Sequence, residues 1–415
     1  MKVMAGIDLH SNNAVCGLVD QDGKRLFHKK VPCDLKSVLE VLAPYKNEMD
    51  TVAVESTFNW YWLVDGLQDN KYHVVLANPA AMKQYSGLKH TDDTSDAFFL
   101  GELLRLKILP TAHIYDRRTR PVRDLLRRRL LLVRQRTSLL LSLKSLHART
   151  TGRPLSQGLA KSMQPEAAAK LFSHPAEKLI AREQAQYIQQ LHRSVAGIEK
   201  LVVAEVKQLP CYEKLQTLPG VGRILGLTIT LETGDIKRFA SAGDYASYCR
   251  TVDSQRLSNG KIKGQNNEKC GNQYLAWAYV EAANFARRSP GPSQRFFDRK
   301  LAKTNRFVAT KSLACKLSKA AWHIMSQGVV FDSKRVFPGP ARESKPERAN
   351  AGKEPKENSA LKPAHLKQKK KNKKIKPIWG ERPENPGRGL VEKPSGLIGT
   401  GRFPSASSHG QTRYF

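Results

Sequence analysis

The 415-residue sequence lacks several features that would place it in a familiar class. It has no apolar run of about 18 residues, so we expect no transmembrane helix and no membrane partner. Near its N-terminus, Asp8 stands where a signal peptide needs an apolar segment, so we expect no secretion. Its six cysteines form no Cys-x-x-Cys pair, which argues against a structural zinc and a disulfide framework. No Walker loop, His-Glu-x-x-His motif or dinucleotide fingerprint is present.

Acidic residues are scarce. The chain has 37 Asp and Glu against 70 Lys and Arg, a formal net charge of +33. An excess of this size predicts a polyanionic partner, and nucleic acid rather than a membrane surface. Residues 331–415 hold 20 Lys and Arg against 8 Asp and Glu, together with ten prolines and few aliphatic residues. Such a segment cannot bury enough apolar surface to fold, so we expect a disordered basic tail.

The first 110 residues alternate between strand and helix patterns. Five short stretches are expected to form strands: 3–9, 14–19, 25–31, 51–55 and 73–77. Three stretches are expected to be helical: 35–42, 60–67 and 94–107. This order predicts a mixed sheet flanked by helices, an α/β domain.

The rest of the chain is expected to be mainly helical. Residues 117–149 hold ten Arg and one Lys against one acid, and they alternate with leucines as in a cationic amphipathic helix. Apolar residues with heptad spacing then predict a coiled coil that could pair two subunits: Ile188, Leu191, Val195, Ile198, Val202 and Leu209. The domains expected are 1–112 (α/β, catalytic), 113–210 (basic helix and coiled-coil linker), 211–328 (mainly α-helical) and 329–415 (disordered basic tail).

Four carboxylates stand at positions that can converge. Asp8 and Glu55 each end a predicted strand, and Asp93 and Asp96 lie three apart at a helix start. If the two strands are neighbours, all four meet at one sheet edge and suit Mg²⁺ or Mn²⁺. Spacing alone would also allow Asp92 in place of Asp93. The alternative is that these acids are solvated or favour a helix N-terminus.

Several further residues are candidates for nucleic-acid contact. Gly220 and Gly222, in Leu-Pro-Gly-Val-Gly at 218–222, resemble a helix-hairpin-helix turn that approaches a phosphate, although an ordinary turn between helices is the alternative. The arginines of the basic helix are expected to contact phosphates: Arg117, Arg118, Arg120, Arg123, Arg127 and Arg128.

A serine lies beside a predicted hairpin turn. Asn259-Gly260 is a strong two-residue hairpin signal, and it places Ser258 close to Arg256, Lys261 and Lys263. These cations could stabilise a serine oxyanion that attacks a phosphodiester, and Lys261 is a candidate for phosphate contact. The alternative is that Ser258 is only a turn residue.

Several fragments together resemble a known family. They are Gly-Ile-Asp-Leu-His at 6–10, Val-Glu-Ser-Thr at 54–57, Asn-Pro at 78–79 and Thr-Asp-Asp-Thr-Ser-Asp-Ala at 91–97. This set is similar to the DEDD-type transposases of insertion-sequence family 110 (group 1111). The family pattern Asp-x-x-Asp-Ala falls on Asp93, Asp96 and Ala97, and Asp92 is a departure because the family has a single acid there. The resemblance covers about residues 1–325.

The resemblance implies a fold and a mechanism. It implies an RNase-H-like, RuvC-like N-terminal domain and a second domain whose serine becomes covalently linked to DNA. The motif points to Ser258, with Ser254 second. It further implies an element-encoded guide RNA that pairs with element ends and target DNA. The enzyme is expected to be a homo-oligomer, a dimer or tetramer, in the bacterial or archaeal cytoplasm near the nucleoid.

Three functions are consistent with these patterns. The first is a transposase or recombinase that cuts and rejoins DNA with the four carboxylates and a serine nucleophile. The second is a junction-resolvase-like, Mg²⁺-dependent endonuclease that forms no covalent intermediate. The third is a non-catalytic nucleic-acid-binding scaffold. A covalent protein–DNA adduct separates the first from the other two.

Overall fold

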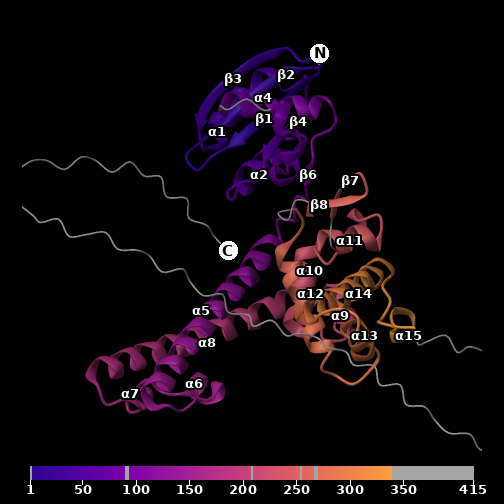
Figure 1. The fold of residues 1–415 in the computed structure, drawn as a ribbon. Helices are drawn as coiled ribbons and strands as arrows, with labels where there is room; N and C mark the ends of the chain where they lie inside the picture. The colour runs from indigo at the N-terminus through magenta and orange to yellow at the C-terminus, as the bar shows by residue number, and fades with distance from the viewer. Residues whose placement is uncertain (1, 89–92, 207–208, 253–254, 266–269, 339–415) are drawn as a thin grey trace, which may run out of the picture. The chain divides into compact units, whose positions relative to one another are not determined.

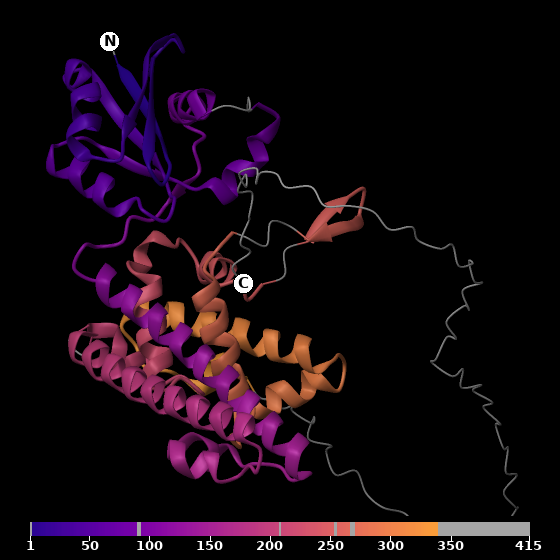
Figure 2. The ribbon, with the colours of Figure 1, turned by 90° about the vertical axis from the view of Figure 1, so that its left-hand side faces the viewer.

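The computed structural model of the chain describes residues 2–88, 93–206, 209–252, 255–265 and 270–338 (Figures 1 and 2). A mixed α/β region at the N-terminal end is followed by a largely helical remainder, as the sequence predicts. No helix within the described ranges is long and apolar enough to cross a membrane.

A six-stranded sheet of order β3-β2-β1-β4-β5-β6 forms the N-terminal region. Its strands are β1 (Val3–Leu9), β2 (Asn13–Asp20), β3 (Arg25–Pro32), β4 (Met49–Glu55), β5 (Val74–Ala77) and β6 (Thr111–Ala112). The central strands β1, β4 and β5 are parallel, and the outer pairings are antiparallel. The five predicted strands are therefore confirmed, and β6 is an addition that is too short, at two residues, to show a strand pattern.

Helices cover both faces of this sheet, so β1 and most of β2 are buried throughout. The helical elements are α1 (Leu35–Leu42), η1 (Ala43–Tyr45), α2 (Tyr61–Asp69), α3 (Pro79–Met82), η2 (Lys83–Leu88) and α4 (Asp93–Arg105). On one face, Ile7 of β1 packs in a cluster with Val38 of α1 and Leu63 of α2. On the other face, Met4 packs with Phe98 of α4.

Two long helices, α5 (Arg120–Thr151) and α8 (Pro175–Val206), lie side by side (Figures 1 and 2). They run antiparallel, because Leu126 of α5 packs with Val202 of α8 whereas Leu143 packs with Ile188. Two short helices, α6 (Gln157–Ser162) and α7 (Pro165–Ala169), connect them. The expected coiled-coil face of α8 thus has its partner inside the chain, so the heptad pattern gives no support for pairing two chains.

The remaining helices form a second compact region around a single apolar cluster. Its elements are α9 (Pro210–Leu215), α10 (Arg223–Thr233), η3 (Ile236–Arg238), α11 (Ala242–Tyr248), β7 (Gln255–Ser258), β8 (Lys261–Gln265), α12 (Gln273–Ala286), α13 (Pro292–Leu301), α14 (Arg306–Gln327) and α15 (Ser333–Val336). Tyr245 of α11 and Tyr279 of α12 are fully buried within it and share a hydrogen bond of 2.8 Å.

The predicted start of the tail at residue 329 needs correction. Residues 333–336 form α15, and Phe337 is buried in the same apolar cluster as the helices before it. Phe331 and Val336 pack against that cluster as well. The lysine-rich composition after 340 hid this short apolar anchor. Residues 339–415, the rest of the predicted tail, lie outside the described residues.

Candidate functional site

The structure places Asp8 and Glu55 at the ends of neighbouring parallel strands. The register of β1 and β4 pairs Ile7 with Val54, so the two acids follow directly at the same edge. Asp8 is buried, and its Oδ2 lies 3.2 Å from Nε2 of His10. Glu55 is partly buried. The condition on which the sequence prediction depended, that the two strands are neighbours, is therefore met.

Helix α4 lies against the sheet face that carries these two acids. A Cβ added to Gly6 would stand 2.1 Å from the carbonyl oxygen of Ala97, so the helix backbone rests directly on the strand. Side chains two apart on a strand share a face, so Gly6 and Asp8 point to the same side. On β4, Ala53 packs with Leu100 of α4. The same alternation places Glu55 on that side.

The start of α4 carries the other two predicted acids. The helix begins at Asp93, and Asp96 is partly buried one turn later, directly before the contact of Ala97 with Gly6. The side chain of Asp93 and all of Asp92 lie outside the described residues. Among the acids, histidines and cysteines that are described, no group of three or more is arranged to hold a metal ion. The four-carboxylate site therefore stays a prediction.

Hydrogen bonds tie together the loops that follow β1 and β4. Asn59 Nδ2 donates to the carbonyl oxygen of His10 over 2.9 Å. Thr57 Oγ1 donates in turn to Asn59 Oδ1, also over 2.9 Å. These bonds join the loop after β4 to the loop after β1. They therefore fix the positions of the two strand ends that carry Asp8 and Glu55 relative to each other. Sequence reasoning missed Asn59, because an asparagine in a loop is common.

The predicted hairpin at Asn259-Gly260 is confirmed. Strands β7 and β8 are antiparallel and pair Ser258 with Lys261 across the turn. The two turn residues have φ of +50° and +70°, as a two-residue hairpin of this kind requires. Ser258 and Lys261 are exposed, and so is Lys263. Ser254 and the side chain of Arg256 lie outside the described residues.

The segment that carries the hairpin leaves α11 and returns to α12 at two neighbouring points, and hydrogen bonds between residues 248–250 and 270–272 join these points. We call this the root of the hairpin segment. Arg250 Nε donates to the carbonyl oxygen of Cys270 over 2.8 Å, and its Nη2 donates to that of Gly271 over 3.2 Å. The backbone N–H of Asn272 donates to the carbonyl oxygen of Tyr248 over 2.7 Å. Any side chain at Gly271 would collide with that oxygen, 2.5 Å from an added Cβ. The two ends of the segment that carries Ser258 are thus joined.

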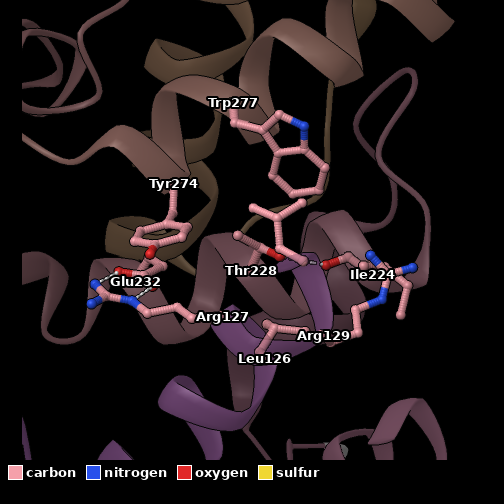
Figure 3. Close-up of a pocket in the computed structure, with 9 residues that line it drawn as sticks. Leu126, Arg127, Arg129, Ile224, Thr228, Glu232, Tyr274 and Trp277 are labelled. Atoms are coloured by element: carbon pink, nitrogen blue, oxygen red, sulfur yellow. Dashed lines mark hydrogen bonds and ion pairs between the residues drawn. The ribbon is translucent and has the colours of Figure 1, made fainter. Parts of the chain in front are cut away.

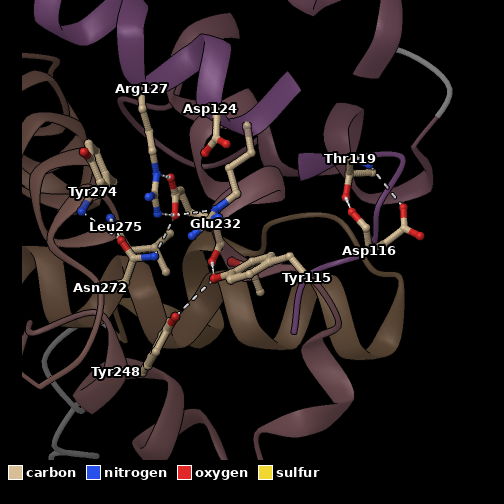
Figure 4. A network of polar contacts seen from close by, with 12 residues as sticks. Tyr115, Asp116, Thr119, Asp124, Arg127, Glu232, Tyr248, Asn272, Tyr274 and Leu275 are labelled. Atoms are coloured by element: carbon tan, nitrogen blue, oxygen red, sulfur yellow. Dashed lines mark hydrogen bonds and ion pairs between the residues drawn. The ribbon is translucent and has the colours of Figure 1, made fainter. Parts of the chain in front are cut away.

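A buried ion-pair network connects this root to α5 (Figure 4). Glu232 of α10 is 2% exposed and accepts hydrogen bonds from Arg123 Nε at 3.1 Å and Arg127 Nη2 at 2.7 Å. Asn272 Nδ2 donates to the same carboxylate over 2.7 Å, and Tyr115 donates to the Glu232 carbonyl oxygen over 2.8 Å. Burial raises the pKa of Glu232, but its bond to Arg127 and the charges of both arginines outweigh this and leave the pKa lowered.

Several arginines predicted to contact phosphates are instead engaged inside the protein. Arg120 is 3% exposed, and its Nη2 donates to Asp65 over 2.6 Å. Arg123 and Arg127 both bind the buried Glu232. Arg117 is exposed, and its Nη1 donates to Asp69 over 2.8 Å. In this structure these arginines hold α5 against α2 and α10 through ion pairs with Asp65 and Glu232.

Three members of the predicted arginine set are exposed, Arg117, Arg118 and Arg128, and of these Arg117 is paired with Asp69. Lys261, on the hairpin, is exposed as well. These cations remain accessible to a phosphate.

The two glycines of the predicted phosphate-binding turn differ in their surroundings. Gly220 has φ +78°, and an added Cβ would stand 2.1 Å from the carbonyl oxygen of Ala282, so packing against α12 accounts for this glycine. Gly222 is exposed, with no atom within 4 Å of an added Cβ. The turn does join two helices, α9 and α10. Phosphate contact at this turn stays a prediction, and Gly222 is the accessible member.

The cavity beside Glu232 is too small for a substrate (Figure 3). Its volume is about 10 Å³, at the lower limit for one water molecule. Figure 3 shows the hydrogen-bonded Arg127 and Glu232 beside the ring of Tyr274, and the guanidinium lies 4.3 Å from that ring's centroid. The arrangement is a packed core contact between α5, α10 and α12.

The chain matches two family models. Residues 5–149 match a model of DEDD transposases of IS110 type, described as "Transposase". Residues 212–298 match the model "Transposase IS116/IS110/IS902 family". The first range contains the four predicted carboxylates, and the second contains Ser258.

Three relatives share parts of the sequence. A "Probable family 20 transposase" of Pseudomonas aeruginosa is 24% identical over 291 residues, which are 68% of this chain and 85% of that protein. The "Transposase for insertion sequence element IS1328" of Yersinia enterocolitica is 28% identical over 123 residues, 29% of this chain and 37% of its own length. An uncharacterized 44.8 kDa protein of insertion element IS116 in Streptomyces clavuligerus is 27% identical over 88 residues, 21% of this chain and 22% of that protein.

Proposed function

The chain belongs to the IS116/IS110/IS902 family of transposases, and from that premise we propose that it cuts and rejoins DNA strands with two sets of residues. The first set is the carboxylates Asp8, Glu55, Asp93 and Asp96 of an RNase-H-like domain. The second is Ser258 on the β7–β8 hairpin. The substrate is the DNA of an insertion sequence and its target, in the bacterial or archaeal cytoplasm.

The observation that carries this proposal is the shared sheet face. Asp8 and Glu55 end adjacent parallel strands, and the first turn of α4 packs on the same side because Gly6 lets its backbone approach. Asp8, Glu55 and the start of α4 come from three segments that are distant in the chain, and their common sheet face supports the proposal that the four carboxylates meet there. A purely structural role would not require such acids at the buried end of a strand, where Asp8 is 4% exposed.

The oxygen donors at this edge fit a hard divalent cation. Carboxylates are the ligands that Mg²⁺ and Mn²⁺ prefer. When bound there, such ions would stabilise negative charge on the oxygens of a reacting phosphate. The protein's own contribution is to fix the acids: the sheet register sets Asp8 beside Glu55, and the bonds through Asn59 hold the two following loops.

Ser258 would supply the nucleophile. Its Oγ forms a bond to phosphorus while one P–O ester bond of the DNA strand breaks, and the leaving oxygen keeps the electron pair and takes up a proton to become a free hydroxyl. The proton of the serine hydroxyl passes to a base or to water. One phosphoester replaces another, so the cut end can be rejoined without an external energy source. The neighbouring Lys261 and Lys263 would favour the charged form of the serine and the approach of a phosphate.

An element-encoded RNA and a second copy of the chain are further parts of the proposal. The net charge of +33 supports a polyanionic partner, and we take RNA as that partner from the resemblance of the sequence motifs to the family. Ser258 and the carboxylates belong to different segments, and we propose that chains combine to complete a site. Mixing Ser258→Ala protein with Asp8→Asn protein should then restore some cleavage. No recovery, with mixed oligomers shown to form, would contradict a shared site.

The carboxylates are tested by single substitutions that keep shape and remove charge. Asp8→Asn, Glu55→Gln, Asp93→Asn and Asp96→Asn should each abolish strand cleavage of element DNA in the presence of RNA and Mg²⁺. Circular dichroism and DNA affinity should stay close to those of the wild-type protein.

Asp92→Asn is the matched control and should be milder than Asp93→Asn. Full cleavage by any one of the four variants removes that residue from the site. An inactive Asp92 variant together with an active Asp93 variant would show that the register in this acid-rich segment is shifted by one residue.

A further inference from the structure

Cations without acidic partners gather between residues 287 and 306. This stretch carries seven Lys and Arg and a single acid, Asp298. The seven are Arg287, Arg288, Arg295, Arg299, Lys300, Lys303 and Arg306. None of them makes an ion pair with any residue that the structure describes. An arginine at the first position of a long helix, as Arg306 is in α14, also opposes the helix dipole. The fold uses only part of this charge: Arg287 Nε donates to Asn284 Oδ1 over 3.3 Å, and Arg299 and Lys300 lie in the last turn of α13, where cations favour the helix dipole.

The end of α12 and the start of α14 bring three of the arginines together. Burial lowers the pKa of Arg287, and the nearby charges of Arg306 and Arg288 lower it further. Arg287 is partly buried, with its guanidinium 5.3 Å from the ring centroid of Phe297, whereas Arg288 and Arg306 are exposed. Repulsion of this kind between like charges is relieved by an anion, because a phosphate beside these arginines would neutralise part of their charge.

Two exposed phenylalanines flank these arginines. Phe307, next to Arg306, is 86% exposed, and Phe285 is 51% exposed. The guanidinium of Arg288 lies 5.7 Å from the Phe285 ring. Phe297 of the same region is buried in the apolar cluster of the second compact region. Neither Phe285 nor Phe307 belongs to that cluster. Aromatic rings among cations form the stacking surface that unpaired bases use.

We propose that this surface, the cationic corner formed by Phe285, Arg287, Arg288, Arg306 and Phe307, binds an unpaired strand of nucleic acid. Arg288 and Arg306 contact successive phosphates, and a base stacks on Phe307. A duplex does not fit this chemistry, because its bases are already stacked on one another and present no free face. An acidic peptide would use the charges but leave the exposed ring without a matching partner.

The inference goes beyond the cleavage chemistry proposed above and shares with it only nucleic acid as the ligand. A binding measurement tests this surface without any cleavage step. The proposed binding would therefore remain supported even if the serine mechanism were shown to be wrong. The unpaired strand can come from DNA opened during recombination or from RNA. Separate probes of oligo(dT) and oligo(rU) distinguish the two sources.

The experiment measures affinity by fluorescence anisotropy on the full chain, with labelled oligo(dT), oligo(rU) and a blunt duplex. Phe307→Ala should weaken single-strand binding about five-fold or more, with duplex binding unchanged. Phe307→Trp should restore the affinity. Because the ring is exposed, the fold should be unaffected. If Phe307→Ala weakens binding of only one of the two oligonucleotides, the surface binds that type of strand, DNA for oligo(dT) and RNA for oligo(rU). If it weakens both equally, the surface binds an unpaired strand of either type.

The charges are tested by the double variant Arg288→Gln, Arg306→Gln. The slope of log K against log salt for oligo(dT) should fall by about 1.4, about 0.7 for each phosphate that these arginines no longer neutralise. Matched controls on α8 are Tyr187→Ala, whose side chain is 53% exposed, and the exposed pair Lys178→Gln, Lys200→Gln, and these should change neither affinity nor slope by as much. Wild-type single-strand affinity in Phe307→Ala, an equal weakening on the duplex, or competition by poly-glutamate as effective as by oligo(dT) would overturn the proposal.

Discussion

At the start of α5, Arg120 and Arg123 are buried against carboxylates of the same chain, whereas at the cationic corner Arg288 and Arg306 are exposed and have no acidic partner among the described residues. Both regions are rich in arginine, and the composition of both predicts phosphate binding. What separates them is the position of acids elsewhere in the sequence: Glu232 is 109 residues away from Arg123. The density of cations alone therefore does not identify a nucleic-acid surface.

The comparison predicts that substitutions in the two regions change the free energy of unfolding by very different amounts. Glu232→Gln leaves two buried guanidinium groups without their counter-charge, so the free energy of unfolding should fall by about 3 to 5 kcal/mol. Urea denaturation followed by circular dichroism measures this. Arg306→Gln, at the exposed corner, should change the free energy of unfolding by about 0.5 kcal/mol or less.

A matched control for Glu232 is available on α8. Glu199 is bonded to Arg129 Nε over 2.9 Å, but its side chain is 35% exposed, so Glu199→Gln should cost only about 1 kcal/mol or less. If Glu232→Gln were as mild as Glu199→Gln, the α5 arginines would not depend on internal pairing. The contrast between the two regions would then disappear.

Salt dependence sharpens the comparison within α5 and the residues just before it. Replacing the exposed Arg118 and Arg128 with Gln should lower the slope of log K against log salt for duplex DNA by about 1.8, about 0.9 for each phosphate contact. Arg120→Gln should leave the slope unchanged and lower stability instead, since its guanidinium is bonded to Asp65. A reduced slope in Arg120→Gln would show that this arginine leaves its internal partner and binds DNA.

The smallest expected effect concerns pH. Burial, and the charges of Arg238 and Arg123, lower the pKa of His113 from 6.5 to about 4. Between these values the unfolded chain binds a proton that the native protein does not. Stability from this group is therefore present above about pH 6.5 and is lost as the pH falls toward 4. His113→Gln should lose less stability than the wild-type protein between pH 7 and pH 5, measured by thermal unfolding, and an equal loss would contradict the shift.

The sequence predicted the parts of the fold that depend on local patterns. The strands of the sheet follow from alternation and β-branched runs, and the hairpin follows from Asn259-Gly260, whose backbone takes positive φ with little strain. The sequence predicts Asp8 and Glu55 at strand ends, and the structure meets the condition that those two strands are parallel neighbours, which the sequence left open.

Long-range contacts could not be predicted from the sequence. Nothing near Glu232 in the sequence indicates that Arg123, Arg127 and Asn272 will surround it. The heptad pattern of α8 correctly indicates a packing face, but its spacing does not say whether the partner is α5 or a second chain. The α15 anchor was missed because its few apolar residues stand between basic ones. In each case the deciding partner lies far along the chain.

The central claim is that Ser258 forms the covalent bond to DNA, and one measurement tests it most directly. The protein is incubated with element DNA, RNA and Mg²⁺, denatured and digested, and the peptides that carry DNA are identified by mass spectrometry. We predict an adduct on Ser258 that is absent in Ser258→Ala. An adduct on Ser254 would move the nucleophile by four residues and keep the mechanism. Metal-dependent cleavage with no protein-linked DNA, or normal recombination by the Ser258→Ala, Ser254→Ala double variant, would contradict the account and favour a resolvase-like nuclease.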